Sequence, residues 1–393
     1  MPVRTLAVNV FEAAMDRLIG LYKEGHRIVL AFSAGKDSGV CLELMRMAAA
    51  EADAGPVDVS MRDEEIMYPG TFEYAERMAV QPDINFHWIY ARQPIINIFN
   101  RYDPYWWVFD ERVPEDDWAR KPPHHLHDPS NGIHVYEIPD KYIQAVITPE
   151  RFPVPDGKDL YSVLGLRTSE SMNRRMGLFS SKGWLTGRNH WGVRSARPIY
   201  DWNDSDVWKA IHDFGWDYNS AYDVMNRLGL PRRLLRIAPP TLTTAGLPAL
   251  QLSRKAWPQW FERVNRRLPG LRTAAMFGMR AVMPDRRLGE TWEDCYRREL
   301  IEKPRSEGVE WVASRAEQMC TTMIGRHAAH SRDPYPDTAL CAMCGQNIGC
   351  WRQLSFIMYN GDPFSMKQNV LPVIEPEFFR EGAGTWGGGK PAF

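Results

Sequence analysis

The sequence predicts an α/β protein whose core is a doubly wound parallel sheet, followed by a helical C-terminal region that contains a cluster of cysteines. In the N-terminal half, short apolar runs typical of strands buried on both faces alternate with segments of helical periodicity. Such alternation favours parallel strands joined by right-handed crossovers. A polar, glycine-containing turn joins the first apolar run to the next helix, and ligands of such sheets bind at the carboxyl ends of the strands.

The elements are predicted from these periods in chain order. Apolar residues at helical spacing from Val10 to Leu21 predict a first helix that ends near Gly25. Residues 28–32 predict the first strand, and the helical period returns from Val40 to Met47. Further strands are expected at residues 57–60, 84–90, 160–166 and around 197–200, and further helices at residues 71–78 and from Asn203 or Asp204 to Gly215.

These elements suggest three regions. We expect an α/β domain over residues 1–225, with a proline- and tryptophan-rich insertion at about 101–158 that lies over the sheet or acts as a lid. A basic, mainly helical region is expected over residues 226–380. The glycine-rich residues 381–393 are expected to form a flexible tail.

The composition excludes several classes of protein. The chain has 393 residues, a formal net charge of −1 and six cysteines, which are too few for a disulfide-stapled secreted fold. No apolar stretch approaches the roughly 18 residues of a membrane span. Glu12, Asp16 and Arg17 interrupt the N-terminal segment where a signal peptide needs an apolar core. We therefore predict a cytoplasmic protein with no membrane partner.

The turn after the first strand has the composition of an anion site. Ser33 to Ser38 supply backbone amides, two hydroxyls and one lysine at the start of a helix, and such a turn holds phosphate through its N–H groups and the helix dipole. The spacing of a Walker A loop is absent. From these residues alone, an ordinary strand-to-helix turn is the alternative.

Four segments in order carry a resemblance to a known family. Residues 33–38 resemble the pyrophosphate loop of the adenine-nucleotide alpha-hydrolase superfamily, which has a Rossmann-like sheet. Residues 63–71, 165–171 and 197–208 bring the likeness closer to the phosphoadenosine phosphosulfate (PAPS) reductase branch. The resemblance covers about residues 25–225 and implies that an adenine nucleotide binds at the carboxyl edge of the sheet.

The resemblance also implies roles for individual residues. Lys36 and Asp37 are expected to be catalytic, and Asp37 to orient Mg²⁺ beside ATP. Asp63 is expected near the nucleotide, and Glu170 is expected to position an arginine. The residues expected to bind the nucleotide, including its phosphates, are Ser33, Ala34, Gly35, Lys36, Asp37, Ser38, Asp63, Arg167, Glu170 and Arg174 or Arg175.

One departure from the family directs the functional hypothesis. Sulfonucleotide reductases of this branch carry a Glu-Cys-Gly-like segment near the C-terminus, and this sequence has none. The superfamily then implies cleavage of ATP at the α-phosphate to activate an acceptor, with sulfur transfer to a nucleic acid as the expected outcome. The alternatives are a PAPS reductase that uses Cys341, Cys344 or Cys350, and a non-catalytic nucleotide-sensing or DNA-binding regulator.

Four cysteines in the C-terminal region form a candidate metal site. Cys341 and Cys344 form a C-x2-C pair, with Cys350 downstream and Cys320 upstream, and four thiolates can bind zinc or an iron–sulfur cluster. Spacing does not separate these two groups. DNA phosphorothioation enzymes and tRNA thiolases of the superfamily resemble this chain in pairing the loop with an iron–sulfur cluster, which favours iron over zinc. Cys295 receives no assignment.

Charge is unevenly distributed along the chain. Residues 51–160 contain 21 acidic and 10 basic residues, whereas residues 227–298 contain 15 basic and 5 acidic residues. The arginines of the basic region surround Trp257, Trp260 and Phe261, a combination that suits binding of DNA or tRNA. A solvated helix face, or an internal partner for the acidic segment, is the alternative. The resemblance also suggests partner subunits in a modification system.

Overall fold

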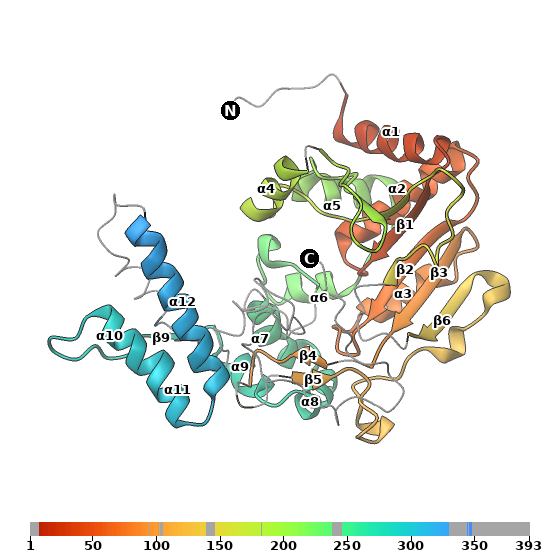
Figure 1. The fold of residues 1–393 in the computed structure, drawn as a ribbon. Coiled ribbons are helices and arrows are strands. Elements are labelled where there is room, and N and C mark those ends of the chain that lie inside the picture. Colours follow the sequence, from red (N-terminus) through yellow and green to blue (C-terminus); the bar gives the residue numbers. More distant parts are fainter. Residues whose placement is uncertain are drawn as a thin grey trace. The chain divides into compact units, whose positions relative to one another are not determined.

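The computed structural model describes residues 8–92, 94–100, 102, 105–138, 146–181, 183–237, 246–329, 344 and 346–347 (Figure 1). The chain divides into two compact units. The first comprises Met1–Gln93, Phe109–Glu111 and Arg120–Ala238, and the second comprises Pro94–Val108, Arg112–Ala119 and Pro239–Phe393. Each unit has its own buried core.

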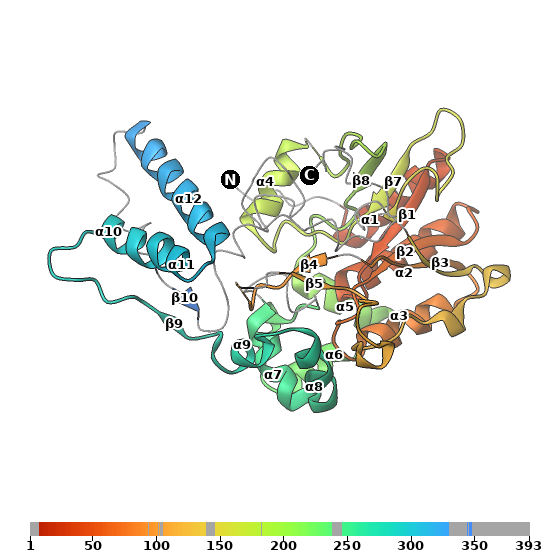
Figure 2. The same ribbon diagram turned by 60° about the horizontal axis from the view of Figure 1, so that its bottom comes forward.

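The first unit is built on a parallel sheet of six strands in the order β6-β3-β2-β1-β7-β8. Figure 1 labels β6, β3, β2 and β1, and Figure 2 labels β7 and β8 beside β1. Every neighbouring pair in it is parallel. The strands are β1 (Arg27–Phe32), β2 (Val57–Asp63), β3 (Ile84–Tyr90), β6 (Ile133–Glu137), β7 (Leu160–Val163) and β8 (Val193–Ala196). The predicted α/β fold class with a parallel sheet is confirmed.

Helices connect and flank these strands. They are α1 (Val10–Lys23), α2 (Lys36–Glu51), α3 (Thr71–Ala79), α4 (Met172–Ser180), α5 (Asp204–Phe214) and α6 (Ala221–Arg227), with short 3-10 turns η2 (His124–Leu126), η3 (Pro129–Asn131) and η5 (Arg232–Leu234). Helix α5 begins at the predicted Asn203 cap, which forms a capping box with Asp206, and ends at Gly215, whose φ is +64°.

The two faces of the sheet are covered differently. On one face, alternate residues of β1 such as Leu30 join the main core beneath α1, α2 and α5. On the other face, Val29 packs against Ile147 and Phe152, which lie between β6 and β7 in the chain. Because both faces of the sheet are buried at β1, this strand is apolar from Ile28 to Phe32, as the sequence predicted.

Two features of this unit differ from the sequence prediction. The segment expected as an irregular insertion contributes β6, which extends the sheet beside β3. The last strand lies at Val193–Ala196 rather than around residues 197–200. Pro198 has no N–H for a ladder, and residues 197–200 instead form a turn in which the Tyr200 amide donates to the Arg197 carbonyl at 3.3 Å.

The second unit is mainly helical. Its elements are the hairpin strands β4 (Pro94–Ile96) and β5 (Tyr105–Trp107), η1 (Glu115–Asp117), α7 (Leu247–Ala256), α8 (Pro258–Arg267), α9 (Leu271–Phe277), β9 (Ala281–Val282), α10 (Trp292–Tyr296), the π-helix η7 (Arg297–Glu302), α11 (Lys303–Ser306), α12 (Glu310–Ala329) and β10 (Gln346–Asn347). The helical C-terminal region is therefore confirmed. Residues 94–108 belong here because the Asn97 amide donates to the Pro269 carbonyl at 3.1 Å and Arg267 donates to the Trp107 carbonyl at 2.6 Å.

Among the described residues, no helix is long and apolar enough to cross a membrane. The predicted flexible tail, residues 381–393, lies outside the described part of the chain.

Candidate functional site

The turn between β1 and α2 has a backbone conformation that its neighbours hold in place. Ala34 has a φ of +53°, which is costly for a residue with a Cβ atom. The side-chain amide of Asn219, which is fully buried, donates to the Ala34 carbonyl and to the Thr71 hydroxyl, each at 3.0 Å. The turn is thus fixed by a residue that lies far away in the sequence.

The two serines of the turn form a small hydrogen-bond network. The Ser33 and Ser38 hydroxyl oxygens lie 3.1 Å apart, and the Ser33 amide donates to the Ser38 hydroxyl oxygen at 3.3 Å. The Ser38 hydroxyl donates to the Gly35 carbonyl at 2.9 Å. This network closes the turn over the start of α2.

The first turn of α2 leaves backbone donors available. Gly35 caps the helix and provides no side-chain acceptor. The Lys36 amide donates to the Tyr222 hydroxyl oxygen at 3.0 Å, whereas the hydrogen bonds of the described residues include no protein acceptor for the Asp37 and Ser38 amides. Burial raises the pKa of Tyr222 far above its usual value, so this hydroxyl stays neutral. A helix start with open amides attracts an anion.

Four charged side chains meet beside this helix start. The Lys36 ammonium lies 3.1 Å from an Asp37 carboxylate oxygen and 3.3 Å from one of Asp204. The Arg167 guanidinium lies 2.7 Å from Asp37 and 3.4 Å from Asp204. Lys36 and Arg167 are only 5% and 4% exposed, so their charges act in a weakly screened environment.

Glu170 extends this network towards α4. Its carboxylate lies 3.5 Å from Arg167 and also pairs with Arg174. The predicted role of Glu170, the positioning of an arginine, is consistent with these contacts.

Gly165 follows β7 and lies so close to α2 that a Cβ there would be 2.8 Å from the Asp37 carbonyl carbon.

These groups line one cavity of about 490 Å³ at the carboxyl end of β1 and β7. Its lining includes Ser33, Gly35, Lys36, Asp37, Ser38, Arg167, Glu170 and Arg174 from the predicted set. It also includes Gly165, Ser169, Asp204, Tyr222, Arg232 and Arg236. The basic groups are Lys36 and four arginines, against Asp37, Glu170 and Asp204, so the cavity suits a multiply charged anion.

Three residues of the predicted set do not line this cavity. Ala34 acts through its backbone, and the Arg175 side chain is exposed on α4. Asp63 is fully buried, where it accepts hydrogen bonds from the Trp88 indole at 2.8 Å, from the Glu65 amide at 2.9 Å and from Arg120. These three donors satisfy the Asp63 carboxylate within the protein. Contact between Asp63 and a nucleotide stays a prediction.

Beside Gly165 and Ser169, four further polar residues that the structure places in the cavity were not in the predicted site. Tyr222 and Asp204 come from α6 and α5, and their motifs carry no phosphate-loop signal. Arg232 and Arg236 were counted with the basic region, but both belong to the first unit and line the cavity. Only the abundance of arginine directly after an α/β domain could have drawn attention to them.

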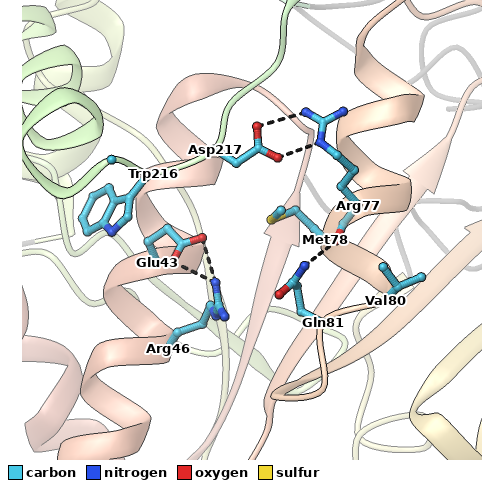
Figure 3. Close-up of a pocket in the computed structure, with 9 residues that line it drawn as sticks. Glu43, Arg46, Arg77, Met78, Val80, Gln81, Trp216 and Asp217 are labelled. Carbon is cyan, nitrogen blue, oxygen red and sulfur yellow. Dashed lines mark hydrogen bonds and ion pairs between the residues drawn. The ribbon is translucent and has the colours of Figure 1, made fainter.

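A second cavity of about 350 Å³ lies between α2, α3 and the segment after α5 (Figure 3). Its charged side chains already have partners. Arg46 pairs with Glu43 at 3.0 Å and with Asp83 at 2.7 Å, and Arg77 pairs with Asp217 at 2.7 Å. The satisfied charges leave little for a ligand to bind, so this cavity is not a candidate site.

The predicted metal ligands are only partly described. Cys320 and Cys344 are both buried in the core of the second unit, and Cys341 and Cys350 lie outside the described residues. No disulfide joins the four cysteines that the structure describes, and no three His, Cys, Asp or Glu side chains among the described residues are grouped to hold a metal ion. Thiolates are donors that zinc and iron–sulfur clusters both use, and Cys320, Cys341, Cys344 and Cys350 stay a predicted ligand set.

The basic region consists of exposed arginines over a buried core. Arg254, Lys255, Arg263, Arg266 and Arg272 are exposed on α7, α8 and α9. Trp257 and Trp260 are half-buried, with ring centroids 6.4 Å apart. Phe261 is fully buried, so it packs the core and cannot stack on a base, contrary to its inclusion among the base-contacting aromatics.

Comparisons with known proteins show similarity but do not establish a family. No protein-family model matches the chain. Protein YbdN of Escherichia coli (strain K12), an uncharacterised protein, is 27% identical over 257 residues. The match covers 60% of this chain and 59% of YbdN, so the chain spans well under two thirds of that relative.

Solved structures with related architecture include two enzymes. The phosphate complex of PAPS reductase from Candida auris is 11% identical over 57% of this chain and 94% of that one, with a TM-score of 0.32. The ATP complex of FMN adenylyltransferase from Candida glabrata is 11% identical over 56% of this chain and 62% of that one, with a TM-score of 0.33. These scores carry no argument about function, which rests on the cavity itself.

Proposed function

We propose that this chain binds ATP in the cavity at the carboxyl ends of β1 and β7 and cleaves it at the α-phosphate to activate an acceptor. The observation that carries the proposal is the convergence of the open α2 start with Lys36 and Arg167 in one anion-binding cavity. The resemblance of residues 33–38 and 165–171 to pyrophosphate-loop enzymes supports an adenine nucleotide as the anion.

In the proposed reaction, an acceptor oxygen forms a bond to the α-phosphorus and the bond to the β-phosphate oxygen breaks. Pyrophosphate leaves, and AMP stays on the acceptor. The Asp37 and Ser38 amides, Lys36 and Arg167 would bind the leaving phosphates and stabilise their developing charge. Asp37 and Asp204 present the carboxylates that would hold Mg²⁺ together with phosphate oxygens.

The acceptor in this proposal is a nucleic acid, DNA or tRNA. Exposed arginines of α7 to α9 supply the charge that a phosphate backbone requires. A hydrosulfide-level sulfur donor would then displace AMP and leave sulfur in place of the acceptor oxygen, without net oxidation or reduction. Partner subunits would deliver that sulfur. Cys320, Cys341, Cys344 and Cys350 would hold an iron–sulfur cluster, which supplies electron-transfer chemistry when bound, or zinc.

Calorimetric titration with Mg²⁺–ATP and, separately, with PAPS tests the first step. A Lys36→Ala variant is expected to bind ATP about 10- to 150-fold more weakly, because a charge-assisted contact contributes about 1.5–3 kcal/mol. Lys209→Ala is the matched control, since that lysine is exposed and pairs only with Asp213 among the described residues. Tight PAPS binding with no ATP binding would contradict the proposal and favour a sulfonucleotide reductase. ATP binding that survives in Lys36→Ala would place the nucleotide elsewhere.

A further inference from the structure

Two arginines of the first unit lie where the cavity opens to solvent. Arg232 and Arg236 line the cavity and both are exposed, whereas Lys36 and Arg167 in the same lining are only 5% and 4% exposed. The described part of the chain provides neither Arg232 nor Arg236 with a hydrogen-bond or ion-pair partner. The buried pair of cations therefore marks the inner end of the cavity, and the exposed pair marks its opening.

The segment that carries the two arginines is anchored to the first unit. Arg232 begins the short turn η5, in which the Leu235 amide donates to the Arg232 carbonyl at 3.0 Å. Leu235 is buried and itself lines the cavity, and Ile237 packs against the main core. These apolar contacts hold the backbone on both sides of Arg236. The guanidinium groups are thus kept beside the cavity although their side chains reach into water.

The positive charge of the cavity that has no counterpart lies on this pair. The lining contains five basic and three acidic side chains, so its net charge is +2. Each acidic side chain already pairs with a basic one other than Arg232 and Arg236. A guanidinium without a carboxylate partner can bind a phosphate group through two parallel hydrogen bonds. The opening of the cavity therefore suits a phosphate beyond those held at the start of α2.

The geometry of the reaction assigns this phosphate to the acceptor, an argument that rests on the proposed function. In a displacement at phosphorus, the attacking and leaving oxygens lie on opposite sides of the phosphorus atom. Pyrophosphate is the leaving group, and the start of α2, Lys36 and Arg167 would hold it at the inner end of the cavity. The acceptor oxygen then approaches from the opening, past Arg232 and Arg236.

We propose that Arg232 and Arg236 bind a phosphate group of the acceptor, the phosphodiester next to the nucleotide that reacts. The first unit then recognises the acceptor directly, in addition to the exposed arginines of α7 to α9. Two explanations compete with this one. If the two arginines hold the phosphates of ATP, their substitution weakens ATP binding. If they form a merely solvated surface, their substitution affects neither ligand.

The double variant Arg232→Gln, Arg236→Gln tests the assignment by two separate titrations. Calorimetry measures Mg²⁺–ATP binding, and fluorescence anisotropy measures binding of labelled single-stranded DNA and RNA of about 12 nucleotides. The variant is expected to keep the ATP affinity of the wild type. It is expected to bind at least one of the two oligonucleotides about 10-fold more weakly, the effect of one charge-assisted hydrogen bond. The slope of its log binding constant against log salt concentration is expected to be shallower by about 0.7 for each phosphate no longer neutralised.

The control is the double variant Arg188→Gln, Lys209→Gln. It removes the same two positive charges from exposed positions of the first unit that do not line the cavity, and it is expected to keep both affinities. Equal oligonucleotide affinity in the two double variants would overturn the proposal, as would a wild-type chain that binds neither oligonucleotide.

Loss of ATP affinity together with oligonucleotide affinity would also overturn the proposal, because the arginines would then belong to the ATP site. So would a wild-type preference for adenosine 3′,5′-bisphosphate over AMP that disappears in Arg232→Gln, Arg236→Gln, because the bound phosphate would then belong to the nucleotide. Failure of the wild type to bind ATP would refute the proposed function. Failure of the two double variants to differ would refute only the present inference.

Discussion

Gly165 offers a direct test of how closely the segment after β7 must approach the turn between β1 and α2. A Cβ atom at this position would lie 2.8 Å from the Asp37 carbonyl carbon and 2.9 Å from both the Asp37 oxygen and the Ser38 nitrogen. All three neighbours are backbone atoms, so no flexible side chain can move aside. Reaching an ordinary contact of 3.4 Å requires a shift of at least about 0.6 Å between the segment and α2.

In Gly165→Ala, that shift displaces the same amides and charges that we expect to bind phosphate. Overpacking of this kind costs about 1–3 kcal/mol. The free protein can relieve it by moving the segment, but the proposed nucleotide complex requires the original geometry. The cost therefore falls on binding, and a 1–3 kcal/mol penalty corresponds to about a 5- to 150-fold increase in the Kd for ATP.

The assay is calorimetric titration of Gly165→Ala with Mg²⁺–ATP beside Gly187→Ala. Gly187 is exposed, and a Cβ there meets no atom within 4 Å, so the control changes the same atoms without the close approach. Wild-type affinity in Gly165→Ala, or an equal loss of affinity in both variants, would refute the idea that this backbone approach shapes the site.

Two further predictions concern the sheet and the basic helices. Burial, aided by the charge of His134, lowers the pKa of His87 from 6.5 to about 4. Between those values the unfolded chain binds a proton that the folded chain does not, so stability is fully present above pH 6.5 and falls as the pH drops towards 4. The melting temperature of His87→Gln is expected to fall less over this range than that of the wild type, and parallel pH profiles would refute the linkage. The double variant Arg263→Gln, Arg266→Gln is expected to bind DNA or tRNA more weakly. In a plot of log binding constant against log salt concentration, its slope is expected to be shallower by about 0.9 for each phosphate that the variant no longer neutralises. Arg188→Gln, an exposed arginine paired with Asp159, is the control, and an unchanged salt dependence in the double variant would argue for a merely solvated face.

The parts of the site that could be predicted from sequence are those whose signal is local. Ser33 to Ser38 follow a strand and start a helix within a few residues, so their order alone suggested an anion site. Arg167 and Glu170 follow β7 by a few residues, and the family resemblance pointed to them. The expected helix cap at Asn203 or Asp204 is an equally local signal, and α5 begins there, with Asn203 as its cap.

The parts that were missed depend on long-range packing. Arg232 and Arg236 were assigned to a nucleic-acid surface because charge patterns do not show which unit a residue joins. The last strand was placed too late because the apolar residues around Pro198 suggested a strand, although proline cannot complete its ladder.

The hydrogen bonds that Tyr222 and Asn219 form with the turn after β1 have a consequence for biosynthesis. The Lys36 amide and the Tyr222 hydroxyl are separated by 186 positions in the chain. At about 5–20 residues per second, a ribosome needs roughly 10–40 s to travel between them. During that interval the nascent turn lacks both the hydroxyl that engages Lys36 and the amide that restrains Ala34. The turn can therefore take up its final conformation only after Asn219 and α6 have been synthesised and have packed against it.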